Sequence, residues 1–450
     1  MPQLRETQAT PETYFADFKR VEDEQGPKEA AWLGSLRKSG MESFAELGFP
    51  SFRQEAWRFT NVAPWAQIPF HLAMPAVGLV NLKEALGHAL LDDVAGRLVF
   101  VNGYFDPALS YVTGLPAGVT ATSLRRAMTA ENQILEQHLG RYADAAREAF
   151  VALNTAFVGD GALVRVAPGV ALERPIHLIY LRVQGAQHSV SYPRTLVVVE
   201  RGAQAQVIES HLALGEEAYF TNAVTELVAG EDASIEHLKV QEESERAFHA
   251  ANVVVHQGRS SRLLSHSISL GSQLARHDVR SVLAGEGAEC TLNGLYQVRG
   301  RQHVDHHTTL DHAMPHCGSR EYYRGILDGK SSAVFNGAII VRKDAQKTDA
   351  IQSNKNLLLS EEATINTKPE LQILADDVRC THGATVGQLD PDAVFYRRAR
   401  GIGREAARHL LTRAFANDVI ARIRYAPARG RLEGILLSRL SAGWRPEEVL

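Results

Sequence analysis

The chain has 450 residues, of which 45% are hydrophobic and 22% charged, and its formal net charge is −4 at pH 7. This composition is typical of a globular protein, and the length exceeds what one compact core usually supports, so we expect two or three regions. The slightly acidic balance provides no electrostatic attraction for a nucleic acid, so we expect no nucleic-acid partner.

Targeting segments and cysteine usage point to the cytoplasm. The first ten residues contain no apolar stretch of the kind found in signal peptides, and no long apolar run could cross a bilayer. Only three cysteines occur, Cys290, Cys317 and Cys380, and none forms a C-x-x-C pair. This speaks against a disulfide framework and against a four-cysteine metal site within the chain. We expect a cytoplasmic protein with no membrane partner.

Residues 1–160 form the first predicted region, which is rich in helix. The stretch from about residue 11 to 47 is charged and amphipathic and is followed by Gly48 and Pro50, a helix stop. Residues 98–105 have the composition of a strand, and residues 123–157 predict a further helix.

Evenly spaced glycines mark the second predicted region, residues 161–402. Gly202, Gly230, Gly258 and Gly285 lie 28, 28 and 27 residues apart, each followed three positions later by Ala or Ser. A fixed period in this range indicates stacked repeats, which bury their apolar faces only against neighbouring repeats. Glycine at each turn fits a backbone position that needs positive φ or a close approach.

The pattern within each repeat predicts strands. Leu264, His266, Ile268 and Leu270 alternate with serines, and a period of two is typical of a strand with one covered face. The signature of leucine-rich repeats is absent. We therefore predict a mainly β protein whose core is a parallel β-helix flanked by helical N- and C-terminal regions. An antiparallel β-sandwich is the alternative.

The third predicted region, residues 403–450, returns to helix. Its apolar stripe includes Leu410, Leu411, Phe415 and Val419. Two roles are open for this region. It either closes the last repeat of the solenoid, whose strand edge would otherwise be unpaired, or projects as a docking site for a partner.

A histidine-rich stretch lies within the predicted solenoid. Six possible metal ligands fall within fifteen residues: His303, His306, His307, His312, His316 and Cys317. These residue types bind zinc or iron, but their spacing matches no standard metal signature. On a strand, His303 and His307 face one way while His306 and His312 face the other. We favour polar residues on the solenoid surface over a metal site, and we expect Cys290, on an apolar alternation, to be buried.

A second candidate site brings together a thiol and an imidazole. Cys380 and His382 are two residues apart, hence on the same side of a strand, and they follow the carboxylates of Asp376 and Asp377. Three interpretations stay open from the chemistry alone. The pair consists of ordinary surface residues, belongs to a metal or cluster site, or forms an acid/base site with the aspartates, as in β-helix carbohydrate enzymes.

Residues 331–402 resemble the core of the SufB/SufD family of iron–sulfur cluster assembly proteins. The resemblance is carried by residues 333–337, 347–349, 356–359, 367–369, 380–386 and 395–402. Residues 55–61 resemble the family's N-terminal motif, so the likeness spans nearly the whole chain. The SufB branch has a cysteine just after the position of Gln352, where this chain has Ser353. The sequence therefore looks like the SufD branch.

The resemblance implies a right-handed parallel β-helix and a non-catalytic role in the SufB–SufC–SufD complex, so we expect no enzyme activity. It implies pairing with SufB through the β-helix and binding of the ABC-type ATPase SufC through the C-terminal region. An isolated chain could form a homodimer instead.

By the same resemblance His382, and less directly Cys380, helps to hold a transient iron–sulfur cluster, or its iron, at an interface shared with SufB. His382 is the metal ligand and no cofactor binds tightly to the isolated chain. The alternative is a purely structural partner, with SufB holding all of the essential chemistry.

Overall fold

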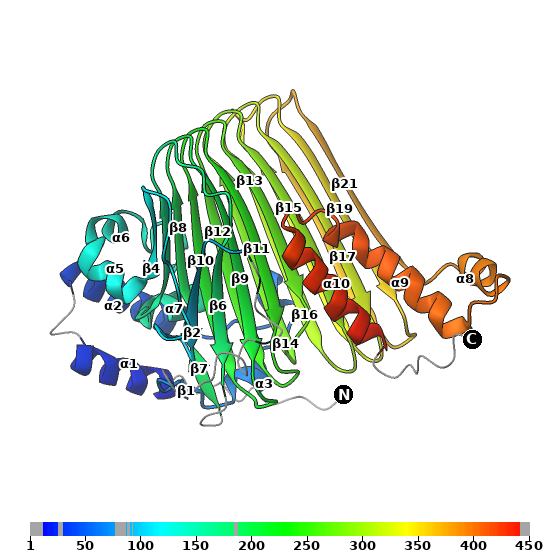
Figure 1. Cartoon of the computed structure of the whole chain (residues 1–450), viewed down its shortest axis with the longest axis horizontal. Helices are drawn as coiled ribbons and strands as arrows, with labels where there is room; N and C mark the ends of the chain where they lie inside the picture. The colour runs from blue at the N-terminus through cyan, green and yellow to red at the C-terminus, as the bar shows by residue number, and fades with distance from the viewer. Residues whose placement is uncertain are drawn as a thin grey trace.

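The computed structural model describes residues 12–25, 30–76, 87, 91, 93–183 and 188–441. The predictions about a signal segment and about the end of the C-terminal region fall on residues 1–11 and 442–450, which lie outside this part of the chain. At the centre of the molecule is a parallel β-solenoid made of two facing sheets (Figure 1). From β5 onward, successive strands of the chain alternate between the two sheets, except that the short β7 and the following β8 both belong to the 11-stranded sheet. One rung therefore contributes a strand to each sheet.

The first sheet has 11 strands, in the order β20-β18-β16-β14-β12-β10-β8-β5-β4 with the short β1 and β7 beside this path. Its strands are β1 (His71–Leu72), β4 (Val119–Ser123), β5 (Gly161–Val166), β7 (Ser189–Ser191), β8 (Arg194–Val199), β10 (Phe220–Ala229), β12 (Phe248–Gln257), β14 (Leu274–Leu283), β16 (His303–His312), β18 (Ser332–Val341) and β20 (Thr364–Ile373).

The second sheet has 10 strands, in the order β21-β19-β17-β15-β13-β11-β9-β6-β2-β3. They are β2 (Gly96–Val101), β3 (Tyr104–Phe105), β6 (Ile176–Arg182), β9 (Gln204–Ala213), β11 (Ser234–Glu242), β13 (Arg262–Ser269), β15 (Glu289–Val298), β17 (Gly318–Leu327), β19 (Asp349–Leu358) and β21 (Arg379–Gly387). Pairings among β5 to β21 are parallel. The predicted mainly β fold with a parallel β-helix core is confirmed, and the sandwich is wrong.

Strand register shows why glycine recurs at the turns. Phe220 on β10 pairs with Phe248 on β12, one repeat further along the chain. At Gly230, Gly258 and Gly285 the turns of neighbouring rungs touch. A Cβ at Gly258 would lie 3.0 Å from the carbonyl carbon of Gly230, and one at Gly285 would lie 2.0 Å from the nitrogen of Arg259. These positions require glycine because two backbones approach each other closely.

The interior of the solenoid has an apolar side and a polar side. Inward-facing residues near the glycine turns are apolar: Ala205, Ile235, Leu263, Cys290, Val255, Leu283 and Leu310. The burial predicted for Cys290 is confirmed. The remainder of the interior carries polar side chains: Glu209, His211, Lys239, Thr225, His249, His277 and His306. Because burying a polar group is costly unless it is hydrogen-bonded or ion-paired, Glu209, Lys239 and His249 belong to polar networks. His277 and His306 have no hydrogen-bond partner, and their rings meet edge-on at 5.4 Å.

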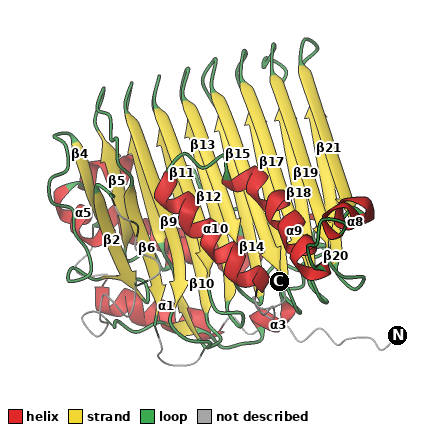
Figure 2. Ribbon diagram, turned by 45° about the vertical axis from the view of Figure 1, so that its right-hand side comes forward, coloured by secondary structure: helices red, strands yellow, loops and turns green. Residues whose placement is uncertain are grey.

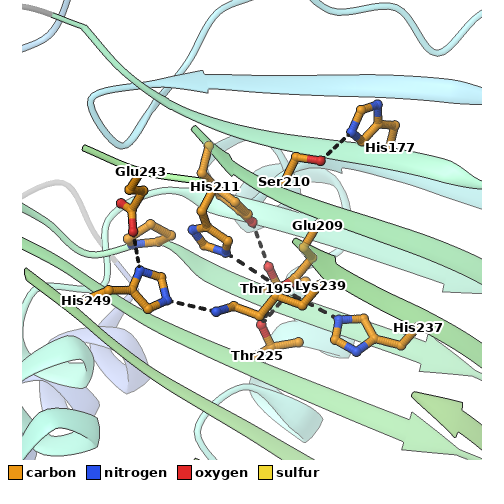
Figure 3. A network of polar contacts seen from close by, with 12 residues as sticks. His177, Thr195, Glu209, Ser210, His211, Thr225, His237, Lys239, Glu243 and His249 are labelled. Carbon is orange, nitrogen blue, oxygen red and sulfur yellow. Dashed lines mark hydrogen bonds and ion pairs between the residues drawn. The ribbon is translucent and has the colours of Figure 1, made fainter. Parts of the chain in front are cut away.

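Figure 3 shows the network of the first rungs. His249 Nδ1 lies 2.7 Å from Glu243 Oε2, and Lys239 Nζ lies 2.8 Å from His249 Nε2. Thr225 donates to the Glu209 carboxylate at 3.0 Å. Burial lowers the pKa of Lys239 to about 8, although both carboxylates oppose the shift. Burial disfavours ionisation of Glu243 as well, but His249 beside it lowers its pKa to about 2. The two carboxylates therefore stabilise one cation and the imidazoles around it.

Helices of the N-terminal region cover the outer face of the 11-stranded sheet. They are α1 (Glu12–Gln25), α2 (Ala31–Leu47), the 3-10 turn η2 (Glu55–Trp57), α3 (Ala63–Ala66), α5 (Leu124–Ala130), α6 (Asn132–His138) and α7 (Ala149–Ala156). Helix α2 ends at Gly48, which has a φ of 61°, as predicted. Aromatic residues make the contact with the sheet: Trp65 stacks on Phe150 at 4.5 Å and meets Phe220 edge-on.

The single helix predicted for residues 123–157 is wrong, because the chain leaves the helix after α6. The backbone N–H groups of Gly140, Tyr142 and Ala143 donate to the carboxylate of Glu226 on β10 at 2.9 to 3.2 Å. Arg194 on β8 also binds Glu226, at 2.6 Å. A buried carboxylate from the sheet thus binds the donors that a continuous helix would have used internally.

The C-terminal helices lie along the side of the solenoid. They are α8 (Pro391–Arg398), α9 (Arg404–Ile420) and α10 (Ala426–Ser441). Figure 2 shows α9 and α10 lying along the 10-stranded sheet. Val419 and Leu432 of these helices pack with Ile268, Leu295 and Ile326 of the sheet. The suggestion that this region closes the last rung is therefore wrong. Helix α8 also falls where strand was predicted, because the Asp390 side chain caps its start and Pro391 opens it.

Candidate functional site

The solenoid is closed at its first rungs and open at its last. At the first rungs the partly buried Phe105, Val112 and Leu115 pack against the interior core. The last rung consists of β20 and β21, the outermost strands of the two sheets. Every residue of β10 is buried, whereas β21 has no buried residue. We call this last rung the open end; within the described residues it presents one free strand edge from each sheet.

Cys380 and His382 lie together at the open end. On β21, Cys380 pairs in register with Ala350 of β19, and His382 pairs with Gln352. Ala350 and Gln352 are buried inside the solenoid, so Cys380 and His382 continue the inward-facing side of the sheet. Cys380 is half-buried against the core, and His382 is exposed. The structure thus places the predicted thiol and imidazole on one face, where solvent or a partner can reach them.

A layer of neutral amides forms the floor of the open end. Gln352 Nε2 donates to Glu321 Oε2 at 2.7 Å, and Thr367 Oγ1 donates to Asn354 Oδ1 at 3.0 Å. Tyr296 donates to Asn356 Oδ1 at 2.5 Å. Burial raises the pKa of Glu321 to about 7, against the effect of its hydrogen bonds. The floor is therefore polar and carries little charge.

The Cys380 thiol is protonated at neutral pH. Burial raises its pKa, the charge of Asp349 adds to the effect, and a hydrogen bond from the Ala350 backbone opposes it. A metal ion binds the thiolate form, so binding iron here releases a proton.

The geometry does not support an acid/base site that combines His382 with Asp376 and Asp377. Asp377 forms an ion pair with Lys347 in the turn that precedes β21. Four residues lie between it and His382, and the part of β21 from Arg379 to His382 alone spans roughly 10 Å. The two aspartates and His382 therefore do not form one site.

No group of three or more His, Cys, Asp or Glu side chains that could hold a metal ion occurs within the part of the chain that the structure describes. At the open end the chain offers one sulfur and one imidazole. Ser353 lies on the opposite face of β19 from these ligands, since it alternates with the buried Gln352 and Asn354. Four protein ligands usually hold a [2Fe–2S] or a [4Fe–4S] cluster, so a cluster bound at the open end would need ligands from elsewhere.

The histidine-rich stretch is divided: His306, His312 and Cys317 are buried, whereas His316 is exposed in a turn. The predicted alternation is confirmed, since His306 and His312 face the interior and are fully buried. His306 stacks on Tyr296 at 5.1 Å, and burial lowers its pKa to about 3. His303 and His307 face the N-terminal region. The surface prediction is wrong for His306 and His312, because the polar side of the interior accommodates imidazoles.

The N-terminal motif of residues 55–61 binds the outside of the 11-stranded sheet. Thr60 Oγ1 donates to Asp305 Oδ2 at 2.5 Å, and Arg276 lies 4.3 Å from the Trp57 ring centroid while pairing with Asp305 at 2.6 Å. Glu55 reaches Lys368 of the last rung at 3.0 Å. The analysis of the sequence identified the motif but missed these partners, which lie more than 200 residues away and carry no spacing signal.

Exposed apolar side chains surround the open end. Leu374 is 67% exposed, Val386 47%, Phe395 70% and Tyr396 58%. Helix α8, which carries Phe395 and Tyr396, buries none of its residues. Such a gathering of apolar residues beside free strand edges is typical of a protein–protein interface. Among the described helices, none is long and apolar enough to span a membrane.

A parallel β-solenoid with a covered first rung and an open last rung, on which a thiol and an imidazole share one face, defines the class of the protein by its fold. Two family models together match most of the chain. Residues 181–415 match the model described as SUF system FeS cluster assembly, SufBD core domain, and residues 8–178 match the SufBD protein N-terminal region. The chain belongs to the SufBD family of iron–sulfur cluster assembly proteins.

Relatives cover the chain nearly end to end. An iron-sulfur cluster assembly SufBD family protein of Synechocystis is 37% identical over 410 residues, covering 89% of each chain. The iron-sulfur cluster assembly protein SufD of Escherichia coli is 30% identical, over 90% of this chain and 92% of its own length. SufD of Bacillus subtilis is 26% identical, over 87% and 90% respectively.

Proposed function

We propose that the chain is a non-catalytic subunit of a SufB–SufC–SufD complex, in which it pairs with SufB through the open end and helps to scaffold a nascent iron–sulfur cluster. The observation that carries the proposal is the uncapped last rung. Its two free strand edges and inward-facing Cys380 and His382 fit a second solenoid better than a small substrate. In the absence of SufB, the same edges could pair two copies of this chain as a homodimer.

A shared cluster follows from the ligands available. This chain contributes His382, with Cys380 as a second and weaker candidate because its thiol is protonated at neutral pH. A neutral imidazole is a workable ligand to iron in such clusters. Since the remaining ligands come from SufB, the cluster binds only while both chains are in contact. Transient binding suits a scaffold that must release its product, and it fits the expectation that no cofactor binds tightly to the isolated chain.

The C-terminal region is the proposed docking site for the SufC ATPase. Helix α9 packs Ala416, Val419 and Ile420 against the solenoid and leaves other apolar side chains outside this contact. Leu410, which belongs to the predicted apolar stripe, is 46% exposed, and Leu437 is 43% exposed. We propose three regions, residues 1–160, 161–402 and 403–450, with the last available to the ATPase.

The test is co-expression with SufB and SufC, followed by anaerobic purification and counting of iron and acid-labile sulfide. His382→Ala should leave the complex intact, because His382 is exposed, and should lower bound iron on the order of tenfold. His316→Ala, at an exposed histidine in a turn, is the matched control and should retain full iron. Wild-type iron content in His382→Ala would remove His382 from the site.

The alternative is a structural partner, with SufB holding all of the essential chemistry. It predicts that both histidine variants retain iron while loss of the open-end contacts abolishes assembly. A stoichiometric cluster on the isolated chain would contradict both proposals. The cytoplasmic location stays a prediction from the cysteine content.

A further inference from the structure

A column of three polar side chains leads from the solenoid interior to His382. Glu321 on β17, Gln352 on β19 and His382 on β21 are successive partners in the strand register. All three project to the inward-facing side of the sheet. Neighbouring strands lie about 4.8 Å apart, so each side chain is within reach of the next one in the column.

The hydrogen bond to Glu321 orients the Gln352 amide. Nε2 donates to the Glu321 carboxylate at 2.7 Å, which leaves Oε1 as the remaining acceptor of the amide. On the other side of the Gln352 amide lies Gly337, where an added Cβ would be 2.2 Å from Gln352 Nε2. The Gln352 side chain therefore occupies the space that a side chain at position 337 would fill. Glu321 on one side and the Gly337 backbone on the other restrict rotation of the Gln352 amide.

Gln352 Oε1 is buried and has no hydrogen-bond partner. A buried acceptor without a donor destabilises the folded state, so its environment should supply one. The neighbouring Asn354 already donates its amide N–H groups to the Tyr296 hydroxyl and the Tyr323 carbonyl. On the side of the open end, the next side chain in the column is His382, and an imidazole always carries at least one N–H.

We propose that Gln352 is a positioning residue for His382: its Oε1 accepts the imidazole N–H and so fixes which ring nitrogen stays unprotonated to bind iron. Glu321 acts through Gln352 by holding the amide in orientation. The inference rests on the proposed function, because it assigns the support of the same site. An acceptor behind a metal-binding histidine selects its tautomer and orients its ring. Without the acceptor, the ring rotates freely and exchanges between two tautomers.

The test is nuclear magnetic resonance of the full chain with ¹⁵N-labelled histidine, alone and in complex with SufB. The His382 signal is the one lost in His382→Ala. In the wild type we expect one dominant tautomer, in the complex at least. Gln352→Met keeps the side-chain length but removes the acceptor, and should give the mixed tautomers of a free imidazole. Asn354→Leu is the matched control, since its neighbour on β21 is Ala384, and should leave His382 unchanged.

Two results would overturn the proposal. One is a mixture of tautomers at His382 in the wild type, both alone and in the complex, which decides the matter even where a variant fails to fold. The other is a folded Gln352→Met with the wild-type tautomer. The result of the tautomer measurement is independent of the result of the iron count. A fixed tautomer combined with full iron in His382→Ala would keep the positioning role and reject His382 as a cluster ligand.

Discussion

The two ends of the solenoid have the same strand arrangement but differ in burial. At the first rungs, strands such as β10 are buried throughout, and the polar side chains Arg194 and Glu226 are paired beneath the covering loop. At the last rung, no residue of β20 or β21 is buried, and none of the described helices covers the inward-facing His382, which is exposed. A parallel solenoid has free strand edges at both ends. In this chain the N-terminal region covers only the end at the first rungs. The comparison supports the proposal that the open end pairs with another chain.

The largest expected effect comes from breaking the closed end. Arg194→Met leaves the Glu226 carboxylate buried without a cation and should reduce the free energy of unfolding by about 3–5 kcal/mol. The measurement is guanidinium unfolding monitored by circular dichroism. Lys368→Met removes the ion pair between Lys368 and Glu55 near the open end. The two side chains are 46% and 64% exposed, respectively. It should leave the free energy of unfolding nearly unchanged, because solvent screens an exposed ion pair. Equal losses would contradict the contrast between the ends.

Acid should destabilise the interior through its neutral histidines. Burial lowers the pKa of His306 to about 3, whereas the unfolded chain protonates it near 6.5. Below pH 6.5 the unfolded state therefore binds the extra proton, and stability falls with pH by up to about 1.4 kcal/mol per unit for this residue until the folded pKa is reached. His306→Phe, which keeps the stacking on Tyr296, should flatten the slope between pH 6.5 and 4. Unfolding free energies over that range provide the test, and an unchanged slope would contradict it.

The smallest effect is expected from a single hydrogen bond at the free edge. The N–H of Arg379 bonds to Thr348, towards β19, so in a parallel strand the N–H of Ala384 points to the open edge. Ala384→Pro removes that donor and should weaken pairing with SufB by about tenfold while leaving unfolding nearly unchanged. Ala384→Val keeps the donor and serves as control. Titration calorimetry gives both affinities, and equal values would show that the edge does not pair.

Sequence alone determined the repeat architecture, because its physical causes are local. The glycines of neighbouring rungs must approach each other at Gly258 and Gly285, and alternation of polar and apolar residues follows from the pleat. Local alternation also predicted that Cys380 and His382 share a face. The burial of Cys290 followed from the same rule.

Only the tertiary structure decided the rest, because it depends on contacts between residues far apart in the chain. Glu226 ends a predicted helix from more than 80 residues away. A polar interior accommodates His306 and His312, which pattern alone assigned to the surface. The packing of α9 and α10 against the side of the sheet leaves the last rung open. Which end of a repeat array is closed is set by where its flanking segments pack, and no periodicity encodes that choice.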